Sequence, residues 1–168
     1  MASLEERIKR LEDRAEIQDL VAGYFRASDD DDFDVLATCF THDARFEASG
    51  FDDASGPAAI VGLIRAARSG MGQTVHTPNY VHISFTGPDS ADGTACAHLE
   101  LGLGAETYFG AVRYLDKYVR EDGVWRIAVR AMKVVHIGPW SEAGQSLTSE
   151  LNVRWPGAEP ARSDFPRL

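Results

Sequence analysis

Apolar residues recur at two different intervals along the chain, and each interval predicts one kind of element. Between Leu4 and Phe25 they return every three or four positions, which places them on one side of a helix. We therefore expect a first helix from about Ser3 to Ser28. From Thr74 onward apolar and polar residues alternate instead, which is typical of strands with one buried face.

Three shorter elements are predicted between these two parts. A helix from Phe33 to Phe40 would bury its aromatic ends, and a strand around Ala44 to Ala48 would end at Gly50. A third helix begins at Pro57, because proline is tolerated in a first helical turn, and it is closed by Gly70.

The alternating part predicts four strands joined by turns. Pro78 lies inside the first strand and implies an edge position or a bulge there, because proline cannot donate a backbone hydrogen bond. Helices followed by an antiparallel meander predict an α+β fold in which three N-terminal helices pack on a strongly bent antiparallel sheet. Such a cone encloses an apolar cavity, the usual small-molecule site. The four predicted strands are Thr74 to Thr86, Thr94 to Leu103, Tyr108 to Glu121 and Val124 to Ile137.

The last part of the chain loses both intervals and is rich in proline. We expect residues 1–137 to form one domain and residues 138–168 to form an extended C-terminal tail that packs on the domain or on a partner subunit. Three aromatic residues are candidate anchors of this tail: Trp140, Trp155 and Phe165.

Composition narrows the range of partners. The 168 residues suffice for a sizeable core without a disulfide. A net charge of -9 argues against nucleic acid and anionic membranes, which need a basic surface, and favours a small hydrophobic molecule. Cys39 and Cys96 match no disulfide or metal spacing, and no apolar run approaches the roughly 18 residues of a membrane span. We therefore expect a cytoplasmic protein without a metal.

Four consecutive aspartates, Asp29 to Asp32, follow the first helix, although acidic residues are disfavoured at a helix C-terminus. One use is structural, because Asp31 or Asp32 can cap the next helix. The other is chemical, because a carboxylate at the mouth of a pocket can orient a histidine and stabilise its charge.

Four motifs carry a resemblance to a known family. LEDRAEIQDLVAGYFRASD, FTHDA, TVHTPN and YVREDGVWRI occur in this order between Leu4 and Ile137. Together they resemble the SnoaL-like branch of the nuclear transport factor 2 (NTF2)-like superfamily. The resemblance implies an α+β cone, usually dimeric, and relatives such as scytalone dehydratase, bile-acid 7α-dehydratase, a hexachlorocyclohexane dehydrochlorinase and polyketide cyclases.

The resemblance also implies site residues. The histidine base and aspartate of the dehydratases and the dehydrochlorinase match His76 and Asp29, and the dehydratase tyrosine matches Tyr24. The dehydrochlorinase pattern has a lysine at the tyrosine position, and Arg130 matches its later cation only loosely, so dehydratase-like chemistry is favoured. Because Tyr24 and Asp29 lie about 140° apart on a continuous helix, the helix must end near Ser28 for both to reach one pocket.

Further substrate-binding candidates rest on weaker signals. The alternation around His98 directs it to solvent or a dimer interface if the apolar positions face the helices, and only the resemblance keeps it as a candidate. Tyr114 could line the cavity or simply pack. Core packing is the more usual role for the large apolar residues, which include Phe46, Phe51, Phe85, Tyr108, Phe109, Met132 and Trp140.

The sequence thus favours a cofactor-independent lyase or isomerase, dehydratase-like, in which a His-Asp pair acts as general base on a small hydrophobic, hydroxylated cyclic or polyketide-like substrate. The alternatives are a non-catalytic ligand-binding or dimerisation module and a polyketide cyclase-like protein. The expected assembly is a homodimer or higher homo-oligomer.

Overall fold

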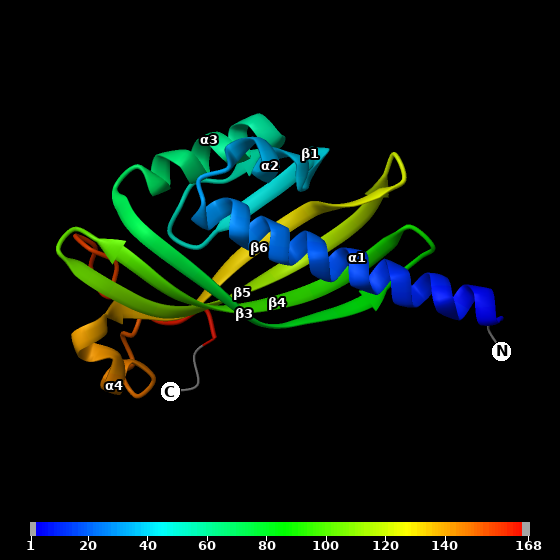
Figure 1. Ribbon diagram of the computed structural model, residues 1–168. Coiled ribbons are helices and arrows are strands. Elements are labelled where there is room, and N and C mark those ends of the chain that lie inside the picture. The colour runs from blue at the N-terminus through cyan, green and yellow to red at the C-terminus, as the bar shows by residue number, and fades with distance from the viewer. Residues whose placement is uncertain (1–2, 166–168) are drawn as a thin grey trace.

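The computed structural model describes residues 3–165, and three helices lie along one side of a curved, six-stranded sheet (Figure 1). This arrangement confirms the predicted α+β cone. The helices are α1 (Leu4–Asp29), α2 (Phe33–Thr38), α3 (Pro57–Arg68), the 3-10 helix η1 (Trp140–Glu142) and α4 (Ala143–Ser146). The strands are β1 (Phe40–Ala48), β2 (Ala54–Ser55), β3 (Met71–Phe85), β4 (Ser90–Leu103), β5 (Glu106–Glu121) and β6 (Val124–Pro139).

The sheet has the order β2-β1-β6-β5-β4-β3, with β1 parallel to β6 and all other neighbours antiparallel. Strand β3 lies at one edge, and its register with β4 shifts between Pro78 and Tyr80. Both expectations for Pro78, an edge strand and a bulge, are therefore confirmed. The missing N–H of the proline costs no ladder hydrogen bond where the pairing is already interrupted.

The short elements differ most from the sequence prediction. The second helix was expected to reach Phe40, but it ends at Thr38, because Phe40 pairs with Ile127 and starts β1. That pairing is long-range, so helical spacing in a short segment could not reveal it. The two-residue strand β2 was not predicted. Strands β3, β4 and β5 begin two to four residues earlier than expected, and β6 ends two residues later.

Local signals account for most element boundaries. Ser3 and Glu6 form a reciprocal capping box at the start of α1, which satisfies two backbone N–H groups that a helix otherwise leaves open. Asp32 caps α2 by accepting a hydrogen bond from the backbone N–H of Val35, as the sequence allowed. The turn between β5 and β6 has positive φ at Asp122 and Gly123, the geometry that such hairpin turns require.

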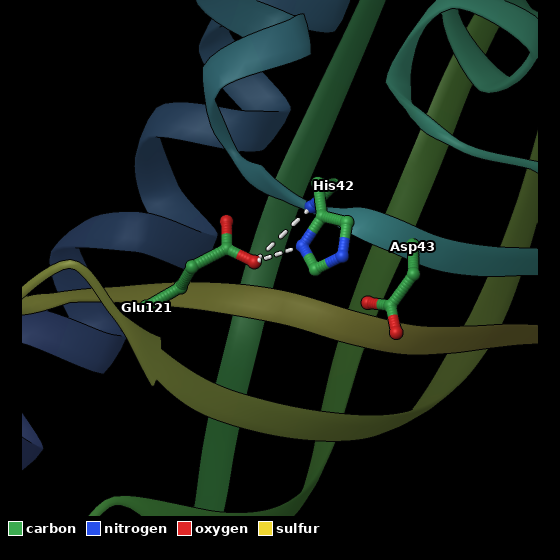
Figure 2. A group of neighbouring side chains, drawn as sticks. All are labelled: His42, Asp43 and Glu121. Atoms are coloured by element: carbon green, nitrogen blue, oxygen red, sulfur yellow. Dashed lines mark hydrogen bonds and ion pairs between the residues drawn. The ribbon is translucent and has the colours of Figure 1, made fainter.

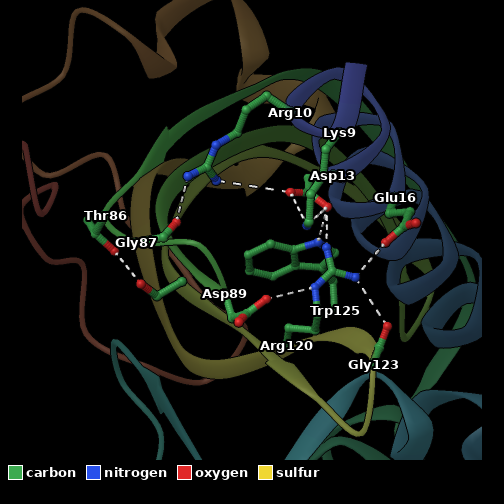
Figure 3. Close-up of polar contacts among 11 residues, drawn as sticks. Lys9, Arg10, Asp13, Glu16, Thr86, Gly87, Asp89, Arg120, Gly123 and Trp125 are labelled. Atoms are coloured by element: carbon green, nitrogen blue, oxygen red, sulfur yellow. Dashed lines mark hydrogen bonds and ion pairs between the residues drawn. The ribbon is translucent and has the colours of Figure 1, made fainter. Parts of the chain in front are cut away.

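Helix α1 is held to the sheet by the buried carboxylate of Asp13 (Figure 3). It accepts hydrogen bonds from Trp125 on β6, from Arg120 on β5 and from Lys9 one turn earlier. Burial alone would raise the pKa of Asp13, but these hydrogen bonds and the charges of Arg120 and Lys9 bring it below its ordinary value. The carboxylate therefore stays ionised and joins three elements.

We predict that Asp13→Ala lowers the free energy of unfolding by about 1–3 kcal/mol, because it leaves the Trp125 N–H without its acceptor and removes one partner of Arg120, which keeps Asp89, Glu16 and Gly123. Urea denaturation measures this. Glu16→Ala is the matched control, since Glu16 contacts the same arginine from an exposed position and should change stability by less than about 0.5 kcal/mol. Equal effects of the two substitutions would contradict the assigned role of Asp13.

The C-terminal tail contains two short helices, η1 and α4, so it is not extended throughout as expected. The tail contacts the sheet through His136 of β6, whose Nδ1 lies 2.8 Å from the Oγ of Ser146 in α4, both residues being buried. Further along, Val153 forms a parallel bridge to Ile137. Two of the expected anchors pack as predicted, Trp155 against Phe51 and Phe165 under the guanidinium of Arg113.

Trp140 is an exception among the expected anchors. Its edge-to-face contact with Phe109 leaves the residue 55% exposed. It follows directly after β6 in η1, where the chain leaves the sheet, so only one side of the indole is covered.

The buried histidine of the tail predicts a dependence of stability on pH. Burial, and to a smaller extent the charge of His98, lowers the pKa of His136, so below about pH 6.5 the unfolded chain binds a proton that the folded chain does not. Stability should therefore fall as the pH drops from about 6.5. His136→Gln should flatten this slope in urea denaturation, whereas His82→Gln, at an exposed position of β3, should keep it. An unchanged slope in the His136 variant would contradict the prediction.

Candidate functional site

The structure brings Asp29 and His76 into direct contact, from the end of α1 and the middle of β3. Oδ1 of Asp29 lies 2.6 Å from Nδ1 of His76, and Oδ2 accepts a hydrogen bond of 2.8 Å from the backbone N–H of the same histidine. Thr74 donates a third hydrogen bond of 2.7 Å to Oδ1. One carboxylate therefore fixes both the backbone and the ring of His76.

The helix end provides this geometry. α1 ends at Asp29, one residue beyond the predicted Ser28, with Asp30 as its exposed C-cap. Asp31 has a φ of 56°, in the left-handed region that aspartate tolerates, and there the chain reverses into α2. The four aspartates thus divide their roles, with Asp29 directed to His76 and Asp32 to the cap of α2.

Arg68, at the end of α3, braces the same turn. Its guanidinium binds the carboxylate of Asp31 at 2.7 Å and the backbone carbonyl of Asp29 at 3.3 Å, and it also donates to the hydroxyl of Thr74. These contacts tie α1, α3 and β3 together beside the His-Asp pair. The arginine was not singled out in the sequence, because its contacts with Asp29 and Asp31 join residues that are far apart in the chain.

The electrostatic setting keeps Asp29 ionised. Burial acts to raise the pKa of its carboxyl, but the hydrogen bonds and charge of His76 and the hydrogen bond from Thr74 together hold the pKa below its ordinary value. The ring of Phe25 stacks on the imidazole, with centroids 5.4 Å apart and an angle of 17° between the planes. His76 Nε2 has no hydrogen-bond partner within residues 3–165.

His76 borders a cavity of about 110 Å³ between α1, α3 and the concave face of the sheet. The lining is almost entirely apolar, so a bound molecule would be largely shielded from water. Its wall includes the following side chains: Tyr24, Phe46, Phe51, Ala67, Met71, His76, Tyr114, Met132 and Trp155.

A buried ion pair lies beneath the two tyrosines of this wall. Arg130 on β6 and Asp116 on β5 are both fully buried and share two hydrogen bonds of 2.9 and 2.7 Å. The guanidinium lies 4.1 Å from the ring centre of Tyr24 and 4.7 Å from that of Tyr114. Tyr118 donates a further hydrogen bond of 2.6 Å to Asp116. Burial raises the pKa values of Tyr24 and Tyr114 despite this positive charge, so both hydroxyls stay protonated.

The remaining sequence candidates divide into two groups. Phe46 and Tyr114 line the cavity with Tyr24, as predicted. His98 and Trp140 lie elsewhere: both are exposed and neither lines the cavity, so their role in substrate binding stays a prediction. For His98 the alternation of β4 had already indicated this, since the apolar neighbours Ala97 and Leu99 are the buried ones.

Sequence reasoning missed Thr74 and Asp116. Thr74 is two residues before His76 on the same strand, so it shares its face, and Asp116 lies in phase with Tyr114 and Tyr118. A charged residue between two buried tyrosines was therefore a visible signal for a buried partner.

A separate cluster of potential metal ligands lies on the surface. His42, Asp43 and Glu121 have ligand atoms within 4.8 Å of one another (Figure 2). The 2.6 Å hydrogen bond between His42 and Glu121 raises the pKa of His42 and lowers that of Glu121, and by itself it accounts for their contact. The cluster faces away from the cavity lining and adds nothing to the site of His76.

Comparison with known proteins identifies the family of this chain. A family model for the SnoaL-like domain matches residues 9–131. The chain belongs to the SnoaL-like family. No curated protein matches it in sequence, and no helix within residues 3–165 combines the length and apolar character needed to cross a membrane.

Solved structures agree with the SnoaL-like assignment. LinA is 25% identical, with a TM-score of 0.77 over 80% of this chain and 94% of that one. The hexachlorocyclohexane dehydrochlorinase LinA-type3 from Novosphingobium barchaimii is 23% identical, with a TM-score of 0.76 over the same shares. A scytalone dehydratase-like protein from Novosphingobium aromaticivorans has a TM-score of 0.77 at 15% identity, over 96% of this chain and 99% of that one.

We predict that Asp116→Ala lowers the free energy of unfolding by about 3–5 kcal/mol, because it leaves the Arg130 charge buried and unpaired. Replacing both partners, Asp116→Leu with Arg130→Met, should recover most of this loss, since apolar residues of similar volume often substitute for a buried ion pair. Guanidinium denaturation of the single and double variants measures the difference. A double variant that is less stable than Asp116→Ala would contradict the prediction.

Proposed function

We propose that this SnoaL-like protein is a cofactor-independent, dehydratase-like lyase in which His76 is the general base and Asp29 its positioning residue. The observation that carries this proposal is the 2.6 Å contact between Asp29 and Nδ1 of a histidine that borders an apolar cavity. Relatives of similar fold that are described as a dehydrochlorinase and as scytalone dehydratase-like add support for an elimination.

Asp29 sets the tautomer of the base. An ionised carboxylate only accepts hydrogen bonds, so Nδ1 carries the proton and Nε2 keeps its lone pair. When Nε2 takes a proton from the substrate, the carboxylate stabilises the imidazolium that forms. The further hydrogen bonds from Thr74 and from the backbone of His76 hold Asp29 in place for this role.

The reaction is the loss of water from a β-hydroxy ketone. His76 removes the proton from the carbon between the carbonyl and the carbinol, and the electron pair of that bond forms the new double bond. The hydroxyl group leaves with a proton as water, and the base returns its proton to solvent or to the leaving oxygen. Proton transfer of this kind contributes typically 10²–10⁴-fold to a rate.

Tyr24 is the proposed donor to the substrate oxygen on which negative charge develops. Its raised pKa keeps the hydroxyl protonated, and the Arg130 guanidinium against its ring adds positive charge behind it. A fixed donor in a site without water stabilises developing charge more strongly than water does. The charged part of the site is therefore small and localised, and the surrounding wall is apolar.

The substrate class follows from the wall of the cavity. Its apolar lining and small volume favour a hydrophobic ring that carries a hydroxyl and a carbonyl, as in cyclic or polyketide-like molecules. The open space next to His76 favours catalysis over a module that only binds or dimerises. A homodimer, a cytoplasmic location and polyketide cyclase-like chemistry stay predictions.

We predict that His76→Ala abolishes turnover and that Asp29→Asn reduces it by about 10²-fold or more, because the amide no longer fixes the tautomer or stabilises the imidazolium. A panel of cyclic β-hydroxy ketones, beginning with 3-hydroxycyclohexanone, tests this through the ultraviolet absorbance of the enone product. His82→Ala, at an exposed position of the same strand, is the matched control and should keep the wild-type rate.

Circular dichroism and thermal unfolding should show that the variants are folded. Conversion of any panel member by the wild type at a rate that His76→Ala retains would refute the general-base role.

A further inference from the structure

A larger groove lies next to the cavity of His76. The groove has a volume of about 620 Å³ and lies between the β1–β2 connection and the C-terminal tail. Its wall shares four residues with the inner cavity: Phe51, Ala67, Met71 and Trp155. These four side chains therefore border both spaces.

Trp155 is the tail residue at this junction. Its indole packs edge-to-face on Phe51, with ring centres 5.9 Å apart. The backbone around it is fixed, because Arg154 donates to Ile137 of β6 at 2.9 Å and Val153 exchanges hydrogen bonds with Ala161. The junction is thus a built part of the fold.

The indole nitrogen of Trp155 is buried and has no hydrogen-bond partner within residues 3–165. A buried donor without an acceptor costs about 1–3 kcal/mol, so an acceptor brought by a ligand would be stabilised there. This donor belongs to one of the four residues that border both spaces.

Size and charge indicate what would occupy the groove. Ligand sites usually measure about 300–1,000 Å³, and the inner cavity alone is smaller, whereas the two spaces together fall within that range. The charged side chains of the groove do not form an anion site, because Glu159 and Asp164 are acidic and Arg162 is paired with Glu150. A neutral, mainly apolar group fits this wall best.

We propose that the groove is a second substrate subsite, and that the substrate is a neutral two-part molecule. Its hydroxylated ring occupies the cavity next to His76, and an apolar arm of several carbons passes Trp155 into the groove. An ether, ester or carbonyl oxygen where ring and arm join accepts a hydrogen bond from the indole N–H. The position of the ring rests on the proposed function, whereas the position of the arm rests on the four side chains that border both spaces.

Binding of 4-alkylphenols tests the arm independently of turnover. Isothermal titration calorimetry with phenol, 4-ethylphenol and 4-butylphenol should show tighter binding along the series, on the order of tenfold between the first and the last, since each methylene buries further apolar surface. Ala158→Trp should remove this gain and leave phenol binding unchanged, because Ala158 lines only the groove. Ala22→Trp, at an exposed position of α1, is the control and should retain the gain.

A second comparison tests the indole N–H. 4-Propoxyphenol has one oxygen in place of one methylene of 4-butylphenol. Trp155→Phe keeps the aromatic packing but loses the N–H donor. In this variant the affinity for 4-propoxyphenol, divided by the affinity for 4-butylphenol, should fall about threefold or more. No gain along the alkyl series, or a gain that Ala158→Trp retains, would overturn the subsite. An unchanged ratio in Trp155→Phe would overturn the hydrogen bond. If the wild type forms no enone but its affinity still rises along the alkylphenol series, the result would instead count against the proposed lyase function.

Discussion

The attachment of the end of α1 to the edge strand β3 is the constraint on which the rest of the site depends. Asp29 accepts three hydrogen bonds from β3, two of them from His76 and one from Thr74, and Arg68 holds the turn that follows. Because the carboxylate is partly buried, each of these partners compensates for its lost hydration. The same contacts that close the cone at this end also orient the histidine.

A second electrostatic feature lies deeper, where Arg130 and Asp116 are buried under Tyr24 and Tyr114. A buried ion pair contributes little net stability compared with apolar residues, because both charges lose their hydration. We interpret the ion pair through the electrostatic field that it creates at the cavity wall. The positive end lies against the aromatic wall of the cavity, and the negative end is turned toward Tyr118.

The tail adds the outer half of the proposed site. The family match covers residues 9–131 and ends before the tail begins. Trp155 therefore lies outside the part of the chain that the family model matches. Substrate selection by such a segment is consistent with the general rule that a scaffold supports many chemistries through its loops and termini.

The sequence by itself determined the order of the elements, the end of α1 near Ser28, the edge position of Pro78 and, through the family motifs, the pairing of Asp29 with His76. These follow from local periodicity, capping and proline chemistry, or from motifs that occur in a fixed order. Tertiary structure decided the partners of these residues. Arg68 meets Asp31, Arg130 meets Asp116, and Trp155 reaches Phe51, only because distant segments are folded over one cavity. Trp140 lies outside the cavity because it follows the end of β6, where the chain leaves the sheet.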